Sequence, residues 1–144
     1  MRVFFDSSSF AKRYIEEAGS EHLEAFCAET TTLGLSILCL PEILSAFNRR
    51  IREKSLNQNQ YQIAKEALIH DIEDADIVRL EEDVLLASIN ILEQTPVQAL
   101  DAIHVASAKV WNAERFITSD HRQHSAALDS GLSSFLIYNS SVPL

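Results

Sequence analysis

Short apolar runs that favour β-strands alternate with segments of helical periodicity along the chain, and this alternation constrains its fold most strongly. Strand candidates are residues 2–5, 30–40, 77–80, 115–118 and 135–138. Strands that alternate with helices indicate an α/β fold with helices on both faces of a mainly parallel sheet. We therefore predict a three-layer α/β/α sandwich that forms a single domain over residues 1–144.

Helices are predicted between these strands from the spacing of apolar residues and from capping patterns. The predicted helices are residues 10–19, 21–29, 41–54, 57–71, 82–92, 96–111 and 125–128. The clearest local pattern is Thr95-Pro-Val-Gln98, which matches a capping box with Thr at the N-cap and Gln at N3. On this pattern the helix begins at Pro96 and carries Asp101 in its second turn.

Length and composition are those of an ordinary globular domain. The 144 residues are enough to bury a core, and three Gly and three Pro leave little room for disorder. Cys27 and Cys39 lack C-x-x-C spacing, so we expect buried thiols, which suit a reducing cytoplasm. The N-terminus does not resemble a signal peptide, and no apolar run approaches the roughly 20 residues needed to span a bilayer. We expect a soluble, cytoplasmic protein without membrane contact.

The net charge of −9 is unusual for a protein that handles nucleic acid, because Lys and Arg make most phosphate contacts. Much of the acid is concentrated in residues 71–83, where seven acids face only one base, as on a solvated surface. A basic cluster on one predicted helix suits either a solvated helix end or a contact with RNA phosphates or an acidic partner; its members are Arg49, Arg50, Arg52 and Lys54. Because a bound cation also reverses the local electrostatics, net charge does not exclude nucleic acid.

Two acids follow predicted strands. Asp6 comes directly after residues 2–5, and Asp120 follows residues 115–118 after Ser119. In open α/β sheets, ligands bind in the crevice at the carboxyl ends of the strands, where both acids would lie. Each also has a simpler explanation, since Asp6 could cap a helix and Asp120 could sit in a turn.

Two further acids lie on predicted helices. Asp101 interrupts an apolar stretch, where an ionised carboxylate is costly unless it is paired, hydrogen-bonded or metal-bound. Glu42 follows Pro41 in the first helical turn, where the helix dipole alone favours an acid by about 0.3–1 kcal/mol. Four acids that converge on one pocket would offer oxygen ligands to Mg²⁺ or Mn²⁺. The five histidines are scattered and provide no zinc spacing.

Four segments carry a family resemblance in consecutive order: Val3-Phe-Phe-Asp-Ser-Ser-Ser9, Leu40-Pro-Glu-Ile-Leu44, Leu100-Asp-Ala-Ile-His-Val-Ala106 and Ile117-Thr-Ser-Asp120. They resemble the PIN domain, and specifically the VapC-like toxin ribonucleases of type II toxin–antitoxin systems. The resemblance implies a Mg²⁺- or Mn²⁺-dependent endoribonuclease in which metal-activated water attacks phosphorus in line and leaves a 3′-hydroxyl and a 5′-phosphate. It also implies the metal ligands, held directly or through water: Asp6, Glu42, Asp101 and Asp120.

The resemblance implies supporting residues and partners as well. Ser8 and Thr118 lie where the family often has polar groups, and His104 is either a general base or a structural residue. Some members have a further acid just after the position of Asp120, whereas this chain has His121-Arg-Gln123, so one or two metals are possible. The family implies a homodimer and an antitoxin peptide in a groove between the early helices; candidate lining residues are Phe10, Tyr14, Phe47 and Tyr61.

Two other functions are compatible with an α/β fold that carries acids. One is a PIN-like binding module without activity. The other is a receiver-like phosphoacceptor domain, which needs an acid pair after the first strand, an acceptor Asp after the third and a Lys after the fifth. The chain has only Asp6 at the first position and no Lys beyond Lys109, which speaks against a receiver.

Overall fold

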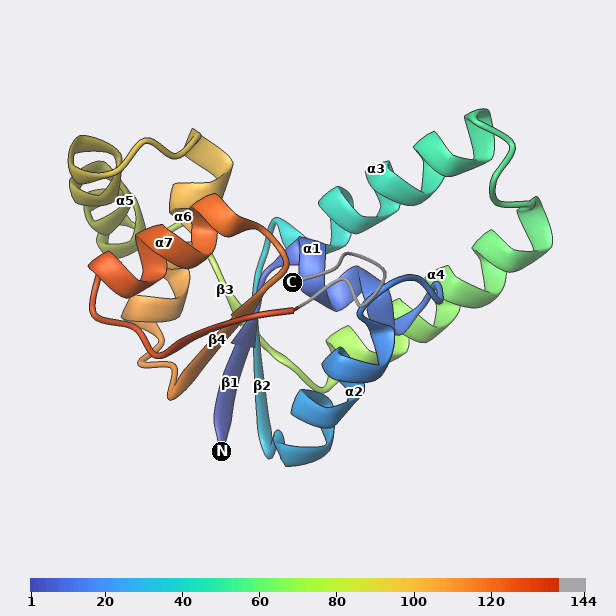
Figure 1. Cartoon of the computed structure of the whole chain (residues 1–144), viewed down its shortest axis with the longest axis horizontal. Helices are drawn as coiled ribbons and strands as arrows, with labels where there is room; N and C mark the ends of the chain where they lie inside the picture. The colour runs from blue at the N-terminus through green and yellow to red at the C-terminus, as the bar shows by residue number, and fades with distance from the viewer. Residues whose placement is uncertain (138–144) are drawn as a thin grey trace.

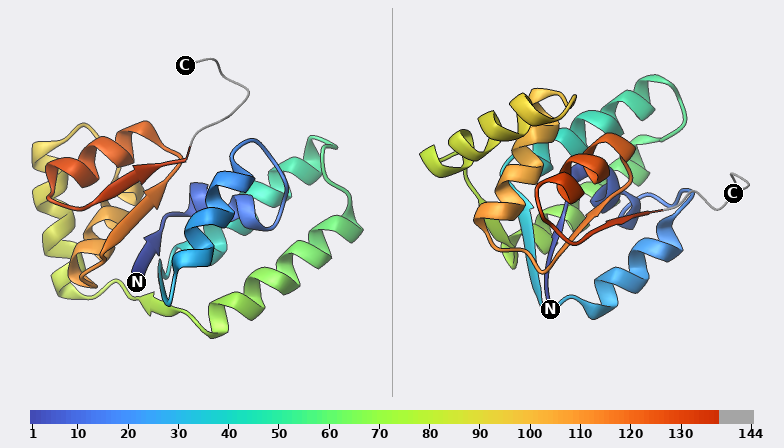
Figure 2. Two further views of the ribbon diagram at one scale, coloured as in Figure 1. Left: turned by 60° about the horizontal axis from the view of Figure 1, so that its bottom comes forward. Right: turned by 60° about the vertical axis from the view of Figure 1, so that its left-hand side comes forward.

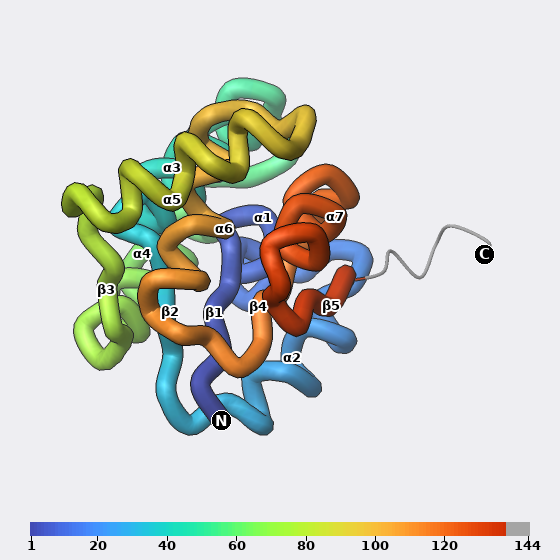
Figure 3. The backbone as a smooth tube through the Cα atoms, turned by 90° about the vertical axis from the view of Figure 1, so that its left-hand side faces the viewer, coloured from blue at the N-terminus to red at the C-terminus, as the bar shows by residue number. Residues whose placement is uncertain are grey.

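The computed structural model describes residues 1–137 and contains a five-stranded sheet in the order β3-β2-β1-β4-β5. All four pairs of neighbouring strands are parallel, and Figure 3 shows them side by side. The strands are β1 (Arg2–Phe5), β2 (Thr32–Ser36), β3 (Asp76–Val78), β4 (Arg115–Thr118) and β5 (Ser134–Leu136). Tyr138, the expected end of the last strand, lies outside the described residues.

Helices cover both faces of this sheet. On one side lie α5 (Glu82–Gln94), α6 (Ala99–Val110) and α7 (His121–Asp129), and on the other lie α1 (Ser7–Phe10), η1 (Ala11–Arg13), α2 (Ser20–Glu29), α3 (Cys39–Arg52) and α4 (Gln58–Glu73). Figure 1 shows the two helical layers on either side of the sheet, and Figure 2 gives the same arrangement from two further directions. The predicted α/β/α sandwich is therefore confirmed. Among residues 1–137, no helix combines the length and apolar character needed to cross a membrane.

Strand β1 lies at the centre of the sheet and separates two hydrophobic cores. Successive side chains of a strand point to opposite faces, so Val3 and Phe5 join the core beneath α1–α4 while Phe4 joins the core beneath α5–α7. Phe4 stacks on Phe116 of β4, with ring centroids 5.9 Å apart. A central parallel strand is buried on both faces, which is why residues 3–5 form a continuous apolar run instead of an alternating one.

The first helix differs from the sequence prediction. Instead of one helix over residues 10–19, a four-residue α1 begins at Ser7 and passes into one 3₁₀ turn that ends at Arg13. Asp6 caps α1, because its Oδ1 accepts a hydrogen bond from the Ser9 amide at 2.9 Å. Gly19 does not end this helix; with a φ of 94° it precedes α2 in a left-handed conformation that suits glycine.

The predicted capping box at Thr95 is wrong. Thr95 ends α5, and its hydroxyl donates to the carbonyl of Ile91 at 2.8 Å. Helix α6 begins at Ala99 after Gln98, so Asp101 lies in the first turn and not in the second. Proline is also common just after a helix end, and Pro96 occupies that position here. The beginning of α6 is less buried than the apolar sequence suggested, since Leu100 is 49% exposed.

Candidate active site

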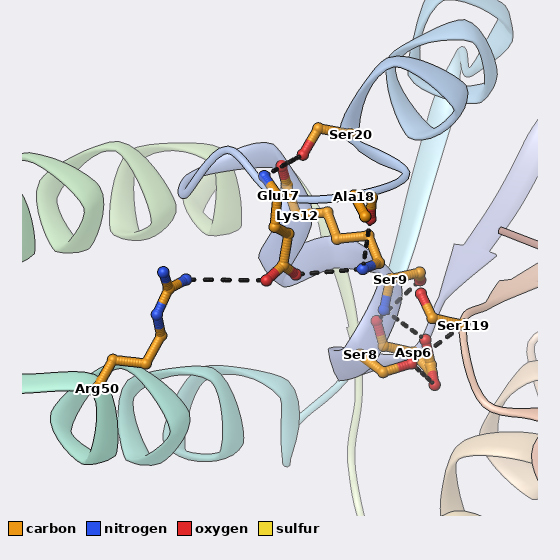
Figure 4. A network of polar contacts seen from close by, with 9 residues as sticks. All are labelled: Asp6, Ser8, Ser9, Lys12, Glu17, Ala18, Ser20, Arg50 and Ser119. Atoms are coloured by element: carbon orange, nitrogen blue, oxygen red, sulfur yellow. Dashed lines mark hydrogen bonds and ion pairs between the residues drawn. The ribbon is translucent and has the colours of Figure 1, made fainter. Parts of the chain in front are cut away.

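Asp6 is completely buried at the carboxyl end of β1 and is held by three hydrogen bonds. Its Oδ1 accepts from the Ser9 amide, and its Oδ2 accepts from the hydroxyls of Ser8 and Thr118, each at 2.7 Å. Figure 4 shows Ser8 and Ser9 gathered around this carboxylate. These donors offset the cost of burying a charged group and fix the side chain in one orientation.

Asp120 lies at the carboxyl end of the neighbouring strand β4 and caps α7. Its Oδ1 accepts hydrogen bonds from the amides of Arg122 and Gln123, at 2.8 and 3.1 Å. The amide of Asp120 donates to the Thr118 hydroxyl at 3.0 Å, and the same hydroxyl donates to Asp6. Thr118 therefore connects the two strand-end acids.

Asp101 is half-buried in the first turn of α6 and contacts α7. Its Oδ1 accepts a hydrogen bond from Nε2 of Gln123 at 2.9 Å. Burial raises the pKa of Asp101, and the negative charges of Asp120 and Asp6 raise it further, against the opposing effects of Gln123 and His104. Three of the predicted acids are therefore near enough to repel one another.

Glu42 lies in the first turn of α3, on the other side of the sheet edge. Its Oε1 accepts from the hydroxyl of Ser7 at 2.8 Å and from Nε2 of His104 at 2.5 Å. Burial by itself would raise the pKa of Glu42, but the hydrogen bond and charge of His104, together with the Ser7 hydrogen bond, lower it. The neighbours of Glu42 therefore favour its ionised form.

Hydrogen bonds and short chain connections join the four acids into a ring. Thr118 links Asp6 to Asp120, and Gln123 links Asp120 to Asp101. Helix α6 connects Asp101 to His104, and His104 binds Glu42. Glu42 also accepts a hydrogen bond from Ser7, which follows Asp6 in the sequence and so closes the ring. We call this arrangement the acid ring; it comprises Asp6, Ser7, Glu42, Asp101, His104, Thr118, Asp120 and Gln123. The structure therefore brings all four sequence-predicted acids together at one edge of the sheet.

Two members of the acid ring were not predicted from the sequence. Gln123 is only 4% exposed and binds Asp101 across 22 sequence positions, a contact that no local pattern indicates. Ser7 stands beside Asp6, but nothing in the sequence pairs it with Glu42. Among the supporting residues that were predicted, Ser8 and Thr118 bind Asp6, while His104 contacts Glu42.

The acid ring has oxygen atoms to offer a divalent cation. Within residues 1–137, no hydrogen bond reaches Oδ2 of Asp101, Oδ2 of Asp120 or Oε2 of Glu42. The described part of the chain has no group of three or more His, Cys, Asp or Glu side chains already close enough to share one ion. Mg²⁺ usually takes one or two carboxylates and keeps several waters, so the oxygen donors fit a hydrated Mg²⁺ or Mn²⁺ ion.

The predicted basic cluster lies away from the acid ring, toward the far end of α3, where the α3–α4 hairpin projects from the molecule (Figure 1). Arg50 pairs with Glu17 at 3.7 Å, and Glu17 also binds Lys12 (Figure 4). The other members, Arg49, Arg52 and Lys54, are exposed. This position agrees better with a solvated helix end or a partner surface than with a role at the acid ring.

The aromatic residues that were considered for a groove have mostly structural contacts. Phe10 and Phe47 are buried in the core beneath α1–α4. Tyr14 donates its hydroxyl to Asp71 of α4 at 2.6 Å, and Tyr61 accepts from Asn48 at 3.1 Å. Beside them, a cavity of about 250 Å³ opens on this side of the sheet; it is lined by Phe5, Phe10, Arg13, Cys27, Thr30, Thr31, Leu33, Asp71 and Asp74.

Comparison with known proteins identifies a family and a common fold. The PIN domain model matches residues 3–128. A toxin–antitoxin complex from Klebsiella pneumoniae is similar with a TM-score of 0.70 and 14% identity, over 95% of this chain and 98% of that chain. FitAcB from Neisseria gonorrhoeae gives 0.68 and 16%, over 92% and 96% of the two chains. VapC20 of Mycobacterium tuberculosis, a sarcin-ricin loop cleaving toxin, gives 0.67 and 17%, over 86% and 94%. A search of curated proteins gives no significant match.

Proposed function

The chain belongs to the PIN domain family, and on that premise we propose that it is a metal-dependent endoribonuclease and the toxin of a toxin–antitoxin pair. The observation that carries this proposal is the acid ring at the carboxyl edge of the sheet. Four carboxylates lie along this edge, and each accepts a hydrogen bond from a neighbouring donor. The charges of Asp120 and Asp6 raise the pKa of Asp101, and a bound cation would offset this repulsion.

Each member of the acid ring has a proposed role. A bound Mg²⁺ or Mn²⁺ ion would lower the pKa of a water molecule and stabilise charge on the attacked phosphate. Asp6, Glu42, Asp101 and Asp120 would hold the ion directly or through water. Ser8 and Thr118 fix the carboxylate of Asp6, and Gln123 fixes that of Asp101. These hydrogen bonds keep the carboxylates in place before substrate arrives.

We assign His104 to positioning and not to proton transfer. The residue is 1% exposed, and its Nε2 is committed to Glu42. Its Nδ1 is buried without a hydrogen-bond partner among residues 1–137. A general base must reach the proton that it abstracts, and a ring enclosed in this way has no free nitrogen facing substrate.

RNA is the substrate that this proposal favours. VapC20, which shares the fold, is described as cleaving the sarcin-ricin loop, an RNA element. The negative charge of this chain would be reversed locally by the bound cation, so RNA phosphate can approach the acid ring. The proposed place of action is the cytoplasm.

An antitoxin is the proposed protein partner. The Klebsiella pneumoniae structure is described as a toxin–antitoxin complex, and it shares this fold. The 250 Å³ cavity beside α2 and α4 is a suitable seat for an apolar part of such a partner, since Phe5, Phe10 and Leu33 line it next to the ion pair of Arg13 and Asp71.

A second copy of the chain is the other proposed partner. Helix α5 exposes four large apolar side chains, each at least 41% exposed: Leu85, Leu86, Ile89 and Leu92. Leu100 at the start of α6 is 49% exposed as well. A contiguous apolar patch on a protein surface usually marks an interaction site, whereas single exposed apolar residues are ordinary. Pairing of two α5 helices in a homodimer would remove these side chains from water.

The proposed activity is tested by RNA cleavage. Purified protein should cut RNA with Mg²⁺ or Mn²⁺ and stop when EDTA is added. Asp6→Asn and Asp101→Asn should each reduce the rate by at least about 100-fold, whereas Asp129→Asn, an exposed acid at the end of α7, should not. Metal-dependent cleavage that survives in both site variants would contradict the site, and a folded protein that cuts no RNA would favour an inactive binding module.

The toxin assignment needs a separate experiment. Expression of the wild-type chain should arrest growth, and expression of Asp6→Asn at the same level should not. Relief of the arrest by a small protein encoded beside this chain would identify the antitoxin. Unchanged growth despite RNA cleavage in the test tube would support the nuclease function and contradict the toxin function.

A further inference from the structure

A small pocket that none of the proposed roles uses lies between the α5–α6 connection and α7. Its volume is about 210 Å³, and it is lined by Thr95, Pro96, Val97, His121, Arg122, Ser125 and Ala126. Ligand pockets for drug-sized molecules usually enclose about 300–1,000 Å³, so this one suits a single ring system. We call it the α7 pocket.

The α7 pocket lies next to the acid ring. His121 and Arg122 follow Asp120 directly, and the connection that carries Pro96 and Val97 leads into the α6 turn that holds Asp101. The hydrogen bond between Gln123 and Asp101 ties α6 to α7 at this point. A group seated in the pocket would therefore be close to a phosphate at the acid ring.

The lining of the α7 pocket combines apolar walls with a cationic rim. Pro96, Val97 and Ala126 provide the walls, and the Thr95 hydroxyl is turned away because it binds the Ile91 carbonyl. At the rim, Arg122 is exposed and makes no ion pair within residues 1–137, although the chain carries a net charge of −9. An unpaired guanidinium beside an apolar hollow complements a flat ring attached to an anion.

Unpaired RNA bases are such groups. Proteins that recognise single-stranded RNA stack its splayed bases on aromatic or histidine rings and on arginine guanidinium planes. His121 and Arg122 offer both surfaces, and Arg122 can also reach phosphate. Building on the proposed nuclease function, we propose that the α7 pocket is a nucleotide subsite that holds an unpaired base next to the cleaved bond and so selects where the RNA is cut.

Binding can be tested without metal and without cleavage. Amide spectra of ¹⁵N-labelled protein in EDTA are recorded with each of the four nucleoside 5′-monophosphates and with ribose 5-phosphate. The nucleotides should shift the amides of Thr95, Val97 and residues 121–126, while ribose 5-phosphate should shift fewer of them. Equal shifts from ribose 5-phosphate would show that the pocket binds only phosphate and would contradict a base subsite. No shift in these residues would also overturn the proposal.

Variants connect the pocket with RNA binding. Ser125→Trp fills the hollow from an exposed position, and Arg122→Ala removes the guanidinium. Each should weaken the binding of a single-stranded RNA in EDTA by about fivefold or more, the loss expected for one stacked base. Lys109→Ala removes an equal charge at the opposite end of α6 and should leave binding within about twofold. Equal losses in all three variants would indicate only a general effect of charge or folding, and would contradict the subsite.

Cleavage mapping separates failure of the subsite from failure of the proposed function. With Mg²⁺, Ser125→Trp should still cut RNA but at altered positions. Wild-type protein that cuts nothing would contradict the nuclease. If wild type and Ser125→Trp cut RNA at identical positions, the proposed nuclease function is supported and the proposed subsite is contradicted. An apolar side chain of an antitoxin is the rival occupant, and loss of antitoxin binding with unchanged nucleotide shifts in Ser125→Trp would favour it.

Discussion

At the scale of single residues, Gln123 shows how a neutral side chain organises an acidic site. Its side-chain Nε2 donates to Asp101, while its backbone N–H donates to the carboxylate of Asp120. The residue is buried, and its Oε1 has no hydrogen-bond partner among residues 1–137. A buried amide that leaves one of its own atoms unsatisfied is retained at a cost in stability, which is consistent with a functional role.

Gln123→Ala should therefore reduce activity while the fold is kept. Without its donor, Asp101 loses its fixed orientation, and kcat/KM for RNA cleavage should fall about 10- to 100-fold, as for other groups that orient metal ligands. Higher Mn²⁺ concentration should restore part of the rate. Gln94→Ala, at the exposed end of α5, is the matched control, and equal losses in the two variants would contradict the role of Gln123.

Asp101 gives a prediction about pH. Burial and the charge of Asp120 raise its pKa in the folded protein above its unfolded value of about 3.9. Folding therefore favours the protonated acid, so the stability that Asp101 contributes is present below the unfolded pKa and is lost as pH rises through the folded pKa. In EDTA at about pH 7, Asp101→Asn should unfold at a higher temperature than wild type.

The same thermal measurement contains its own control. The advantage of Asp101→Asn should disappear near about pH 3, where wild-type Asp101 is protonated as well. Added Mg²⁺ should stabilise wild type more than the variant, since a ligand that binds only the folded state raises its stability. A variant that is less stable than wild type in EDTA at neutral pH would show that the carboxylate is not repelled at this site.

At the scale of elements, β2 and α6 meet at one glycine. Gly34 lies under Trp111 at the end of α6, and a Cβ at position 34 would be only 2.7 Å from the indole ring. The guanidinium of Arg2 covers the same ring at 4.0 Å, so the indole is enclosed and cannot move aside freely. This close approach explains a glycine inside a strand, where the residue is otherwise unfavourable.

Gly34→Ala should reduce the free energy of unfolding by about 1–3 kcal/mol through overpacking. Denaturation by urea measures the loss. In a Trp111→Leu background the same substitution should have a smaller effect, because the smaller side chain leaves room for the methyl group. An equal loss in both backgrounds would show that the indole ring is not the obstacle.

Boundaries of elements were predicted less well than their order. Helix α4 begins at Gln58, one residue after its predicted start at Asn57, because Asn57 is the N-cap and forms a capping box with Gln60. The box proposed at Thr95 failed because its hydroxyl found a carbonyl in the preceding helix. Both threonine and asparagine can bind backbone on either side, and local sequence does not decide which partner is nearer.

At the scale of the whole molecule, the exposed apolar side of α5 predicts self-association. Leu86→Glu and Ile89→Glu should each shift a homodimer to monomers in light-scattering measurements, because charge is excluded from an apolar interface. Ile63→Glu, on α4 and 63% exposed, is the control for loss of an exposed isoleucine elsewhere. A wild-type monomer at high concentration would contradict the homodimer, and dissociation by Ile63→Glu would place the interface on α4.

The sequence by itself determined the class of fold and the family, and it located the four acids that we propose as the site. A strand that is buried on both faces is a continuous apolar run, and a helix that is buried on one face has apolar residues at helical spacing. Because both patterns are local, β1 and β4 could be located together with the acids that follow them. Helix bounds, the cap of α1 and the turn that carries Asp101 depended on which groups happened to be adjacent. Only the tertiary structure decided those bounds and supplied the Ser7–Glu42–His104 and Gln123–Asp101 contacts. The reason is physical: hydrogen bonds between residues 22 to 62 positions apart form only after the sheet has brought their helices together.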